Sequence, residues 1–161
     1  MMRYSISLLI FTLLCSLPIG GVFAYPNYQS APKSESGHQY MRLHHRSVIY
    51  FAPSRDTHVD TFLLGTFTND CALKERDVVS IVVTKEGFSY PEWVASIFDY
   101  ATLSAFFNIK EGSHAAILIG KDGEEKRRWS DKIDWTQLQE HIDEMPLRQQ
   151  ESLITKTRCS I

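Results

Sequence analysis

Cys71 and Cys159, the two cysteines that follow the apolar N-terminal segment, carry the most direct chemical consequences in this chain. In an oxidising compartment a pair of cysteines is often a disulfide, and a bridge that closes so long a loop contributes roughly 3–5 kcal/mol in the chain-entropy model. In the alternative, Cys71 is a buried apolar residue and Cys159 lies in a frayed tail. The sequence does not set the distance between the two sulfur atoms, so both interpretations stay open.

The loop at residues 52–58 contains a second group of reactive residue types. If a helix begins there, its free N–H groups attract anions, and Arg55 would add a charge-assisted donor. We therefore predict a binding role for Ser54, Arg55 and Asp56. In the alternative, Asp56 only caps the helix and Arg55 is solvated. A nucleophilic Ser54 would need a histidine base and an orienting acid, and no motif supplies them.

The six histidines are scattered along the chain. His44 and His45 are adjacent and would point to opposite faces of a strand. His58, His114 and His141 form no i, i+4 pair of the kind that binds zinc. We therefore expect no metal site and no cofactor, and no catalytic residues are assigned.

The charged residues are nearly balanced, with 17 Lys and Arg against 19 Asp and Glu and a net charge of −2. Nucleic-acid-binding domains usually carry a basic excess, so no nucleic-acid partner is expected. The basic stretch 126–128, with Lys121 nearby, could contact an acidic partner, but Glu124 and Glu125 favour a solvated edge. The expected partner is an unidentified protein or a component of the cell envelope.

Residues 1–24 have the pattern of a cleaved signal peptide. Arg3 provides the positive charge, residues 6–17 form the apolar run, and Val22 and Ala24 occupy the −3 and −1 positions of a cleavage site. The apolar run is shorter than the ~20 residues that a membrane span needs. The sequence therefore predicts export to the periplasm or secretion, with cleavage after Ala24.

The mature chain divides into three parts. Residues 25–45 contain proline, glycine and serine with little apolar periodicity, which predicts a flexible leader. Residues 46–151 form the domain, and residues 152–161 form a polar, loose tail. No later segment is apolar for long enough to cross a membrane, so the mature product is expected to be soluble.

Buried strands and amphipathic helices alternate within the predicted domain. The predicted strands are residues 47–52, 78–83, 115–119 and 124–129. The predicted helices begin after caps at Asp56, at the capping box Ser89-x-x-Glu92 and at Asp134, and they end near Phe67, near Phe107 and at Met145, before Pro146. The Gly-Lys-Asp-Gly segment 120–123 predicts a hairpin, and its charged returning strand suits a sheet edge.

The resulting order is β-α-β-α-β-β-α, with two right-handed crossovers between parallel strands and then a hairpin. This is a thioredoxin-like arrangement, so an α/β fold is expected, with a four-stranded mixed sheet flanked by helices. Redox-active domains of this kind carry two cysteines in the loop after the first strand and a cis-proline before the third strand. Loop 52–58 has no cysteine and segment 112–115 has no proline. Dithiol chemistry is therefore not expected, and Cys71, near the end of the first helix, is poorly placed for a thiolate.

Two groups of stretches together resemble a known family. One group comprises Arg46 with the strand ending Phe51-Ala52-Pro53-Ser54, then Glu75-Arg76-Asp77, and then Leu118-Ile119-Gly120-Lys121-Asp122-Gly123 with Lys126. The other is Ile142–Glu151, which contains Met145-Pro146-x-Arg148-x-x-Glu151. Together they resemble a thioredoxin-like domain of unknown function of bacterial exported proteins. That domain is related to one in animal extracellular matrix proteins, the sushi-repeat-containing and coiled-coil-domain-containing proteins, and the resemblance covers about residues 46–151.

The resemblance implies a thioredoxin-like fold and supplies no settled catalytic residues. A peroxiredoxin-like role suggested for such domains is an analogy of fold. The matching polar positions either surround a binding surface or serve as turn and capping residues; they are Arg76, Asp77, Lys121, Asp122, Lys126, Arg148 and Glu151. We therefore expect a non-catalytic binding module that uses Arg76, Lys121, Lys126 and Arg148 besides the 54–56 loop. The alternative is an unconventional thiol-dependent oxidoreductase that uses Cys71 or Cys159.

Overall fold

The computed structural model describes residues 43–154 and residue 159. The expected signal peptide and residues 25–42 of the expected leader lie outside this part. The strands are β1 (Arg46–Ala52), β2 (Val78–Thr84), β3 (Ser89–Tyr90), β4 (Ala115–Ile119) and β5 (Glu125–Trp129). The helices are α1 (Thr57–Thr68), α2 (Asp70–Glu75), α3 (Val94–Ile97), α4 (Tyr100–Phe106), α5 (Trp135–Asp143) and α6 (Pro146–Ile154).

The strands form one mixed sheet in the order β3-β2-β1-β4-β5. The central strand β1 pairs parallel with β2 and antiparallel with β4, so that Ile49 lies between Ile81 and Ile117. The four expected strands are present, and β3 makes a fifth at the edge beside β2. The expectation of a second parallel crossover is wrong, because β4 enters the sheet beside β1 and runs in the opposite direction. The charged strand β5 lies at the other edge, as predicted.

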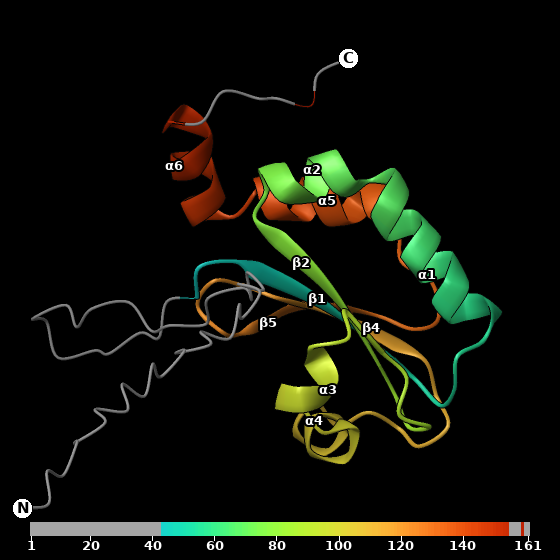
Figure 1. The fold of residues 1–161 in the computed structure, drawn as a ribbon. Helices are drawn as coiled ribbons and strands as arrows, with labels where there is room; N and C mark the ends of the chain where they lie inside the picture. The colour runs from blue at the N-terminus through green and yellow to red at the C-terminus, as the bar shows by residue number, and fades with distance from the viewer. Residues whose placement is uncertain (1–42, 155–158, 160–161) are drawn as a thin grey trace, which may run out of the picture.

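The sheet separates two apolar layers, because successive side chains of a strand point to opposite faces. On one face Val48 and Tyr50 join the core that includes residues of α1 and α5. On the other face Ile49 and Phe51 join the core that includes residues of α3 and α4. Figure 1 shows α1, α2 and α5 on one side of the sheet and α3 and α4 on the other. Coverage of both faces explains why the central strands carry apolar residues on both faces of the sheet.

The segment 89–107 departs from the expected single helix. Ser89 does not cap a helix; it lies in β3, which pairs antiparallel with β2. Two short helices follow, because Phe98 is extended and the side chain of Asp99 caps α4 by accepting from the Thr102 N–H. An N-cap residue has non-helical backbone angles, so a cap in mid-segment divides the helix. The predicted capping box is therefore wrong.

The predicted helix caps at Asp56 and Asp134 are confirmed. The Asp56 carboxylate accepts from two N–H groups in the first turn of α1, and Asp134 accepts from the Gln137 N–H in α5. The short helix α2 was not expected from the pattern.

The C-terminal part of the domain is more ordered than its composition predicts. Helix α5 ends at Asp143, and Pro146 begins α6, since the first turn of a helix needs no N–H at that position. The first residues of the tail expected to be loose from residue 152 are helical as far as Ile154. Among the described residues, no helix is long and apolar enough to cross a membrane.

Gly65, in the middle of α1, allows the Trp135 indole to lie against the helix. A Cβ at this position would overlap the indole ring, which packs against Phe62 with the ring centroids 5.5 Å apart. Gly65→Ala is therefore expected to lower the free energy of unfolding by about 1–3 kcal/mol, although alanine favours helix. Urea unfolding measures the change, with Leu64→Ala on the exposed face as control. An unchanged or more stable Gly65→Ala protein would contradict this packing.

Candidate functional site

The predicted binding residues lie at opposite ends of the central strand. Ser54, Arg55 and Asp56 follow the C-terminal end of β1. Arg76, Lys121, Lys126 and Arg148 lie toward its first residue, Arg46. The 7 residues of β1 span about 20 Å at the usual rise per residue. The structure thus divides one predicted set into two separate regions.

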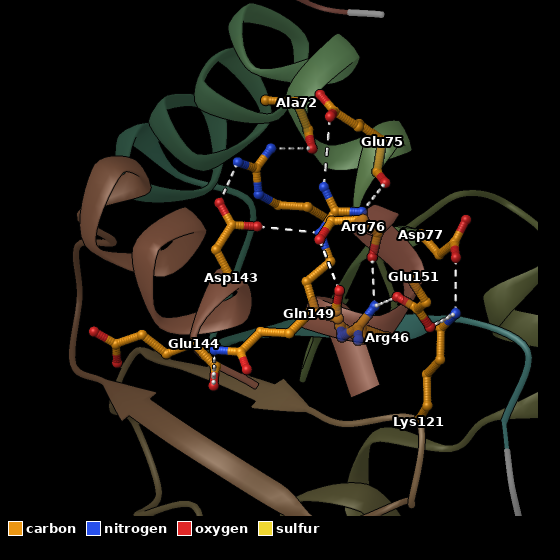
Figure 2. A network of polar contacts seen from close by, with 12 residues as sticks. Arg46, Ala72, Glu75, Arg76, Asp77, Lys121, Asp143, Glu144, Gln149 and Glu151 are labelled. Carbon is orange, nitrogen blue, oxygen red and sulfur yellow. Dashed lines mark hydrogen bonds and ion pairs between the residues drawn. The ribbon is translucent and has the colours of Figure 1, made fainter. Parts of the chain in front are cut away.

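At the N-terminal end of β1, ion pairs surround the guanidinium of Arg46, which is only 1% exposed. Arg46 Nη1 donates to the Arg76 carbonyl at 2.9 Å and to Glu151 Oε2 at 3.1 Å. The other oxygen of Glu151 accepts from Lys121 Nζ at 2.7 Å, and Lys121 also donates to Asp77 at 2.7 Å. Figure 2 shows Glu151 between Arg46 and Lys121.

A second group of ion pairs continues from this one toward α5. The buried Arg148 donates from Nη1 to the Glu75 carbonyl at 2.9 Å and from Nε to Asp143 Oδ1 at 3.1 Å. Arg76 Nη2 donates to the other oxygen of Asp143 at 2.5 Å. Burial alone would raise the pKa of the Asp143 carboxyl, but the hydrogen bonds from Arg76 and Arg148 lower it overall. Asp143 is therefore a carboxylate at neutral pH.

We call these residues the Arg46 network: Arg46, Glu75, Arg76, Asp77, Lys121, Asp143, Arg148 and Glu151. The network has as many carboxylates as cations, and it joins β1, α2, the β4–β5 hairpin, α5 and α6. These contacts support the structural alternative for the polar residues that carry the family resemblance, in which they hold the elements of the domain together. The polar positions predicted from the sequence include five members of the network but not Arg46, Glu75 or Asp143. Nothing local marks Asp143, a surface aspartate of α5, as the partner of arginines that follow α2 and lie in α6.

A pocket of 710 Å³ lies beside this network, between the β4–β5 hairpin and the α5–α6 connection. We call it the hairpin pocket. Its lining includes Arg46, Lys121, Lys126, Met145, Pro146 and Leu147. Lys126 pairs there with Asp122 and Glu124. Burial alone would lower the pKa of Lys126, but these two hydrogen bonds raise it overall. Lys126 is therefore a cation at the pocket edge.

At the C-terminal end of β1, Asp56 contacts two histidines that are far apart in the sequence. His114 Nε2 lies 2.9 Å from Asp56 Oδ2, and the rings of His58 and His114 lie with centroids 4.7 Å apart. We call Asp56, His58 and His114 the Asp56 cluster. Sequence reasoning missed it, because the two histidines share no local spacing.

A second pocket, of 460 Å³, lies next to the Asp56 cluster and is lined by Tyr50, His58, Asp131 and Trp135 among others. The Tyr50 hydroxyl donates to the Asp131 carbonyl at 2.8 Å. Burial, and then the nearby carboxylates, raise the pKa of Tyr50 well above its ordinary value. The phenol is therefore protonated throughout the physiological range. Among the described residues, no three or more His, Cys, Asp or Glu side chains are arranged to hold a metal ion.

The remaining predicted residues of this end have surface contacts. Arg55 pairs with Asp60 at 3.3 Å, and its guanidinium lies 4.6 Å from the centre of the Phe88 ring. Ser54 is half-buried in the loop. Asp56 caps α1, and Arg55 is exposed. These positions agree with the alternative in which the loop caps the helix and its arginine is solvated.

Cys71 and Cys159 form a disulfide, with their Cα atoms 5.8 Å apart. Cys71 is exposed and lies in the first turn of α2, not at the end of a longer first helix. The alternative of a buried, apolar Cys71 is therefore wrong. The bridge connects α2 to the chain beyond α6.

The Asp56 carboxylate is expected to stabilise α1 in a pH-dependent way. Burial would raise its pKa, but hydrogen bonds from Val59, His114 and His58 lower it overall. A carboxyl with a depressed folded-state pKa stabilises the protein above its unfolded pKa of ~3.9 and loses that contribution as the pH falls through the folded value. Asp56→Ala should therefore cost about 1 kcal/mol near neutral pH, and less at strongly acidic pH.

Urea unfolding of the wild type and of Asp56→Ala at neutral and acidic pH measures this difference. Asp56→Asn is the control, because its amide oxygen can still cap α1 while the charge beside His114 is lost. A difference in stability that is the same at both pH values would show that the carboxylate charge contributes nothing.

The fold and these sites define a mixed α/β domain with a buried ion-pair network and a disulfide that ties its C-terminal segment to α2. The chain belongs to the family described as a domain of unknown function, DUF4174, which matches residues 39–151. The expected membership in a family of domains of unknown function is thereby confirmed. Searches of curated proteins and of solved structures found no match.

Proposed function

We propose that this protein is an exported, non-catalytic binding module with a thioredoxin-like fold. The order β2-β1-β4-β5, the parallel β1–β2 pair, the antiparallel β4 and the terminal hairpin support this assignment. In this proposal β3 is an addition at the β2 edge. A relation to the domains of animal extracellular matrix proteins belongs to the same proposal and rests on the sequence stretches that carry the resemblance.

The observation that carries the proposal is the position of the thiols. Loop 53–56, where a redox domain of this fold places its dithiol, has no cysteine, and its Asp56 side chain is held by His114. Cys71 and Cys159 are bonded to each other beyond the far end of α1, a helix of 12 residues that spans about 18 Å. No free thiol of the described part of the chain therefore lies at the end of β1.

Export is the second element of the proposal. The signal-peptide pattern of residues 1–24 supports it, and so does the disulfide, since disulfides persist mainly in oxidising compartments. The proposed location is the periplasm or the extracellular space. The proposed partner is a protein or a cell-envelope component.

The hairpin pocket is the proposed binding region, with Lys121 and Lys126 at its surface and Arg76 and Arg148 supporting it from the Arg46 network. The loop containing Ser54, Arg55 and Asp56 would be a separate, smaller contact region. A pocket with an apolar wall and a few charged groups is the usual form of a ligand site.

Turnover assays and mass measurement test the non-catalytic assignment. The purified mature protein is expected to reduce no insulin and to have no peroxidase activity. Its intact mass should begin at Tyr25, and alkylation should add two groups only after reduction. Measurable activity that is lost in a Cys71→Ser/Cys159→Ser protein would instead establish the unconventional thiol enzyme.

A further inference from the structure

The hairpin pocket has the size of a site for a small organic molecule. Its volume of 710 Å³ lies within the range of roughly 300–1,000 Å³ that is typical of ligand pockets. Met145, Pro146 and Leu147 make its lining apolar on the side of the α5–α6 connection. The hairpin residues on the other side carry charges, so the two sides differ in chemistry.

Arg46 lines this pocket with donors that the Arg46 network does not use. Both of its hydrogen bonds within the described residues leave from Nη1, although a guanidinium carries five N–H donors. Its Nε is buried and has no hydrogen-bond partner among residues 43–154 and 159. Arg46 is 1% exposed, so only the edge of its guanidinium that lines the pocket can donate to a bound acceptor.

Lys121 and Lys126 add two ammonium groups to the same lining. Each Nζ contacts two carboxylates, which leaves one of its three N–H donors for a ligand. Gly120 lets the stem of Lys126 cross the hairpin, because a Cβ there would lie 2.6 Å from Lys126 Cε. The backbone of the hairpin therefore positions the ammonium group at the pocket.

The carboxylates of the lining are largely neutralised by other partners. Asp122 pairs with Lys126, and Glu125 pairs with Arg128. Glu144 is exposed just beyond the end of α5. On the hairpin side, away from Glu144, the unused hydrogen-bonding capacity of the pocket is therefore that of donors on cations, which complements an anionic group.

We propose that the hairpin pocket binds a small amphipathic carboxylate. Its carboxylate would accept from Arg46, Lys121 and Lys126, and its apolar chain would pack on Met145, Pro146 and Leu147. This inference rests on the proposed binding function and names the ligand class of that site. A carboxylate suits the site because its two oxygens can accept from a guanidinium and an ammonium at once.

Octanoate is the probe, titrated into the mature protein and followed by calorimetry and by the ¹³C signal of the Met145 methyl group. Octanoate is expected to bind and to shift this signal, whereas octylammonium and octanamide do neither. Lys126→Gln should weaken octanoate binding about fivefold or more. Lys74→Gln is the matched control, since Lys74 and Lys126 both pair with an aspartate four residues earlier, and it should leave the affinity within about twofold.

Three results would overturn the inference: no binding of octanoate, equal binding of octanamide, or an affinity that Lys74→Gln and Lys126→Gln reduce alike. A short peptide acid that binds where octanoate fails would also overturn it, in favour of a peptide C-terminus. The turnover assays are separate measurements. If the turnover assays detect no activity and octanoate does not bind, the proposed non-catalytic function is retained and only the proposed ligand class is rejected.

Discussion

Replacing Arg46 with methionine is expected to lower the free energy of unfolding by about 3–5 kcal/mol, the usual result of removing one partner from a buried ion pair. The guanidinium is 1% exposed and is the only contact of Glu151 Oε2 among the described residues. Without it, this oxygen and the Arg76 carbonyl both lose their donor. Methionine has a similar length, so the loss measures the polar contacts more than a cavity.

Urea unfolding of the wild type, two single variants and one double variant separates the effect of losing Arg46 from the effect of losing any arginine. Arg55→Met is the control, because Arg55 is 57% exposed and its ion pair should contribute less than about 1 kcal/mol. The double variant Arg46→Met/Glu151→Gln should be more stable than Arg46→Met alone, because it removes the carboxylate left without its partner. Equal losses for Arg46→Met and Arg55→Met would show that the Arg46 network does not stabilise the fold.

Removing the disulfide has the second large expected effect. Cys71→Ser/Cys159→Ser should lower the free energy of unfolding by about 2–5 kcal/mol, because the open chain gains conformational freedom when it unfolds. The bridge closes a loop of 88 residues, and it joins Cys159 to α2. Helix α6 should stay in place in the folded variant, since Arg148 and Glu151 also anchor it.

Thermal and urea unfolding of the wild type and the double-serine variant, each with and without a reductant, measure this contribution. The reductant should destabilise the wild type and leave the stability of the variant unchanged. The variant therefore controls for effects of the reductant other than reduction of the disulfide. A wild type whose stability does not respond to the reductant, while its thiols become alkylated, would contradict a stabilising bridge.

Several features of this protein follow from the sequence alone, because they depend on residues close together in the chain. The strands at 47–52, 78–83, 115–119 and 124–129 are apolar or charged runs bounded by turns, and all four are present. The caps at Asp56 and Asp134 need only an acidic side chain three residues or fewer from the N–H groups it accepts from. The edge position of β5 follows from its own charge.

Other features were decided by the tertiary structure, because their partners are far apart in the sequence. The short strand β3 forms only because β2 offers it an edge, and that pairing replaces the helix start expected at Ser89. His58 and His114 meet at Asp56 because β4 enters the sheet beside β1.

The pairing of the cysteines and the burial of the Arg46 network also required the folded chain. Composition left Cys71 with two interpretations, and only the folded chain brings its Cα within 5.8 Å of the Cα of Cys159, 88 residues away. A charged residue such as Arg46 can be buried only when carboxylates from other elements reach it. The local sequence pattern therefore determined most of the helices and strands, and contacts between distant segments determined where the ion pairs and the disulfide form.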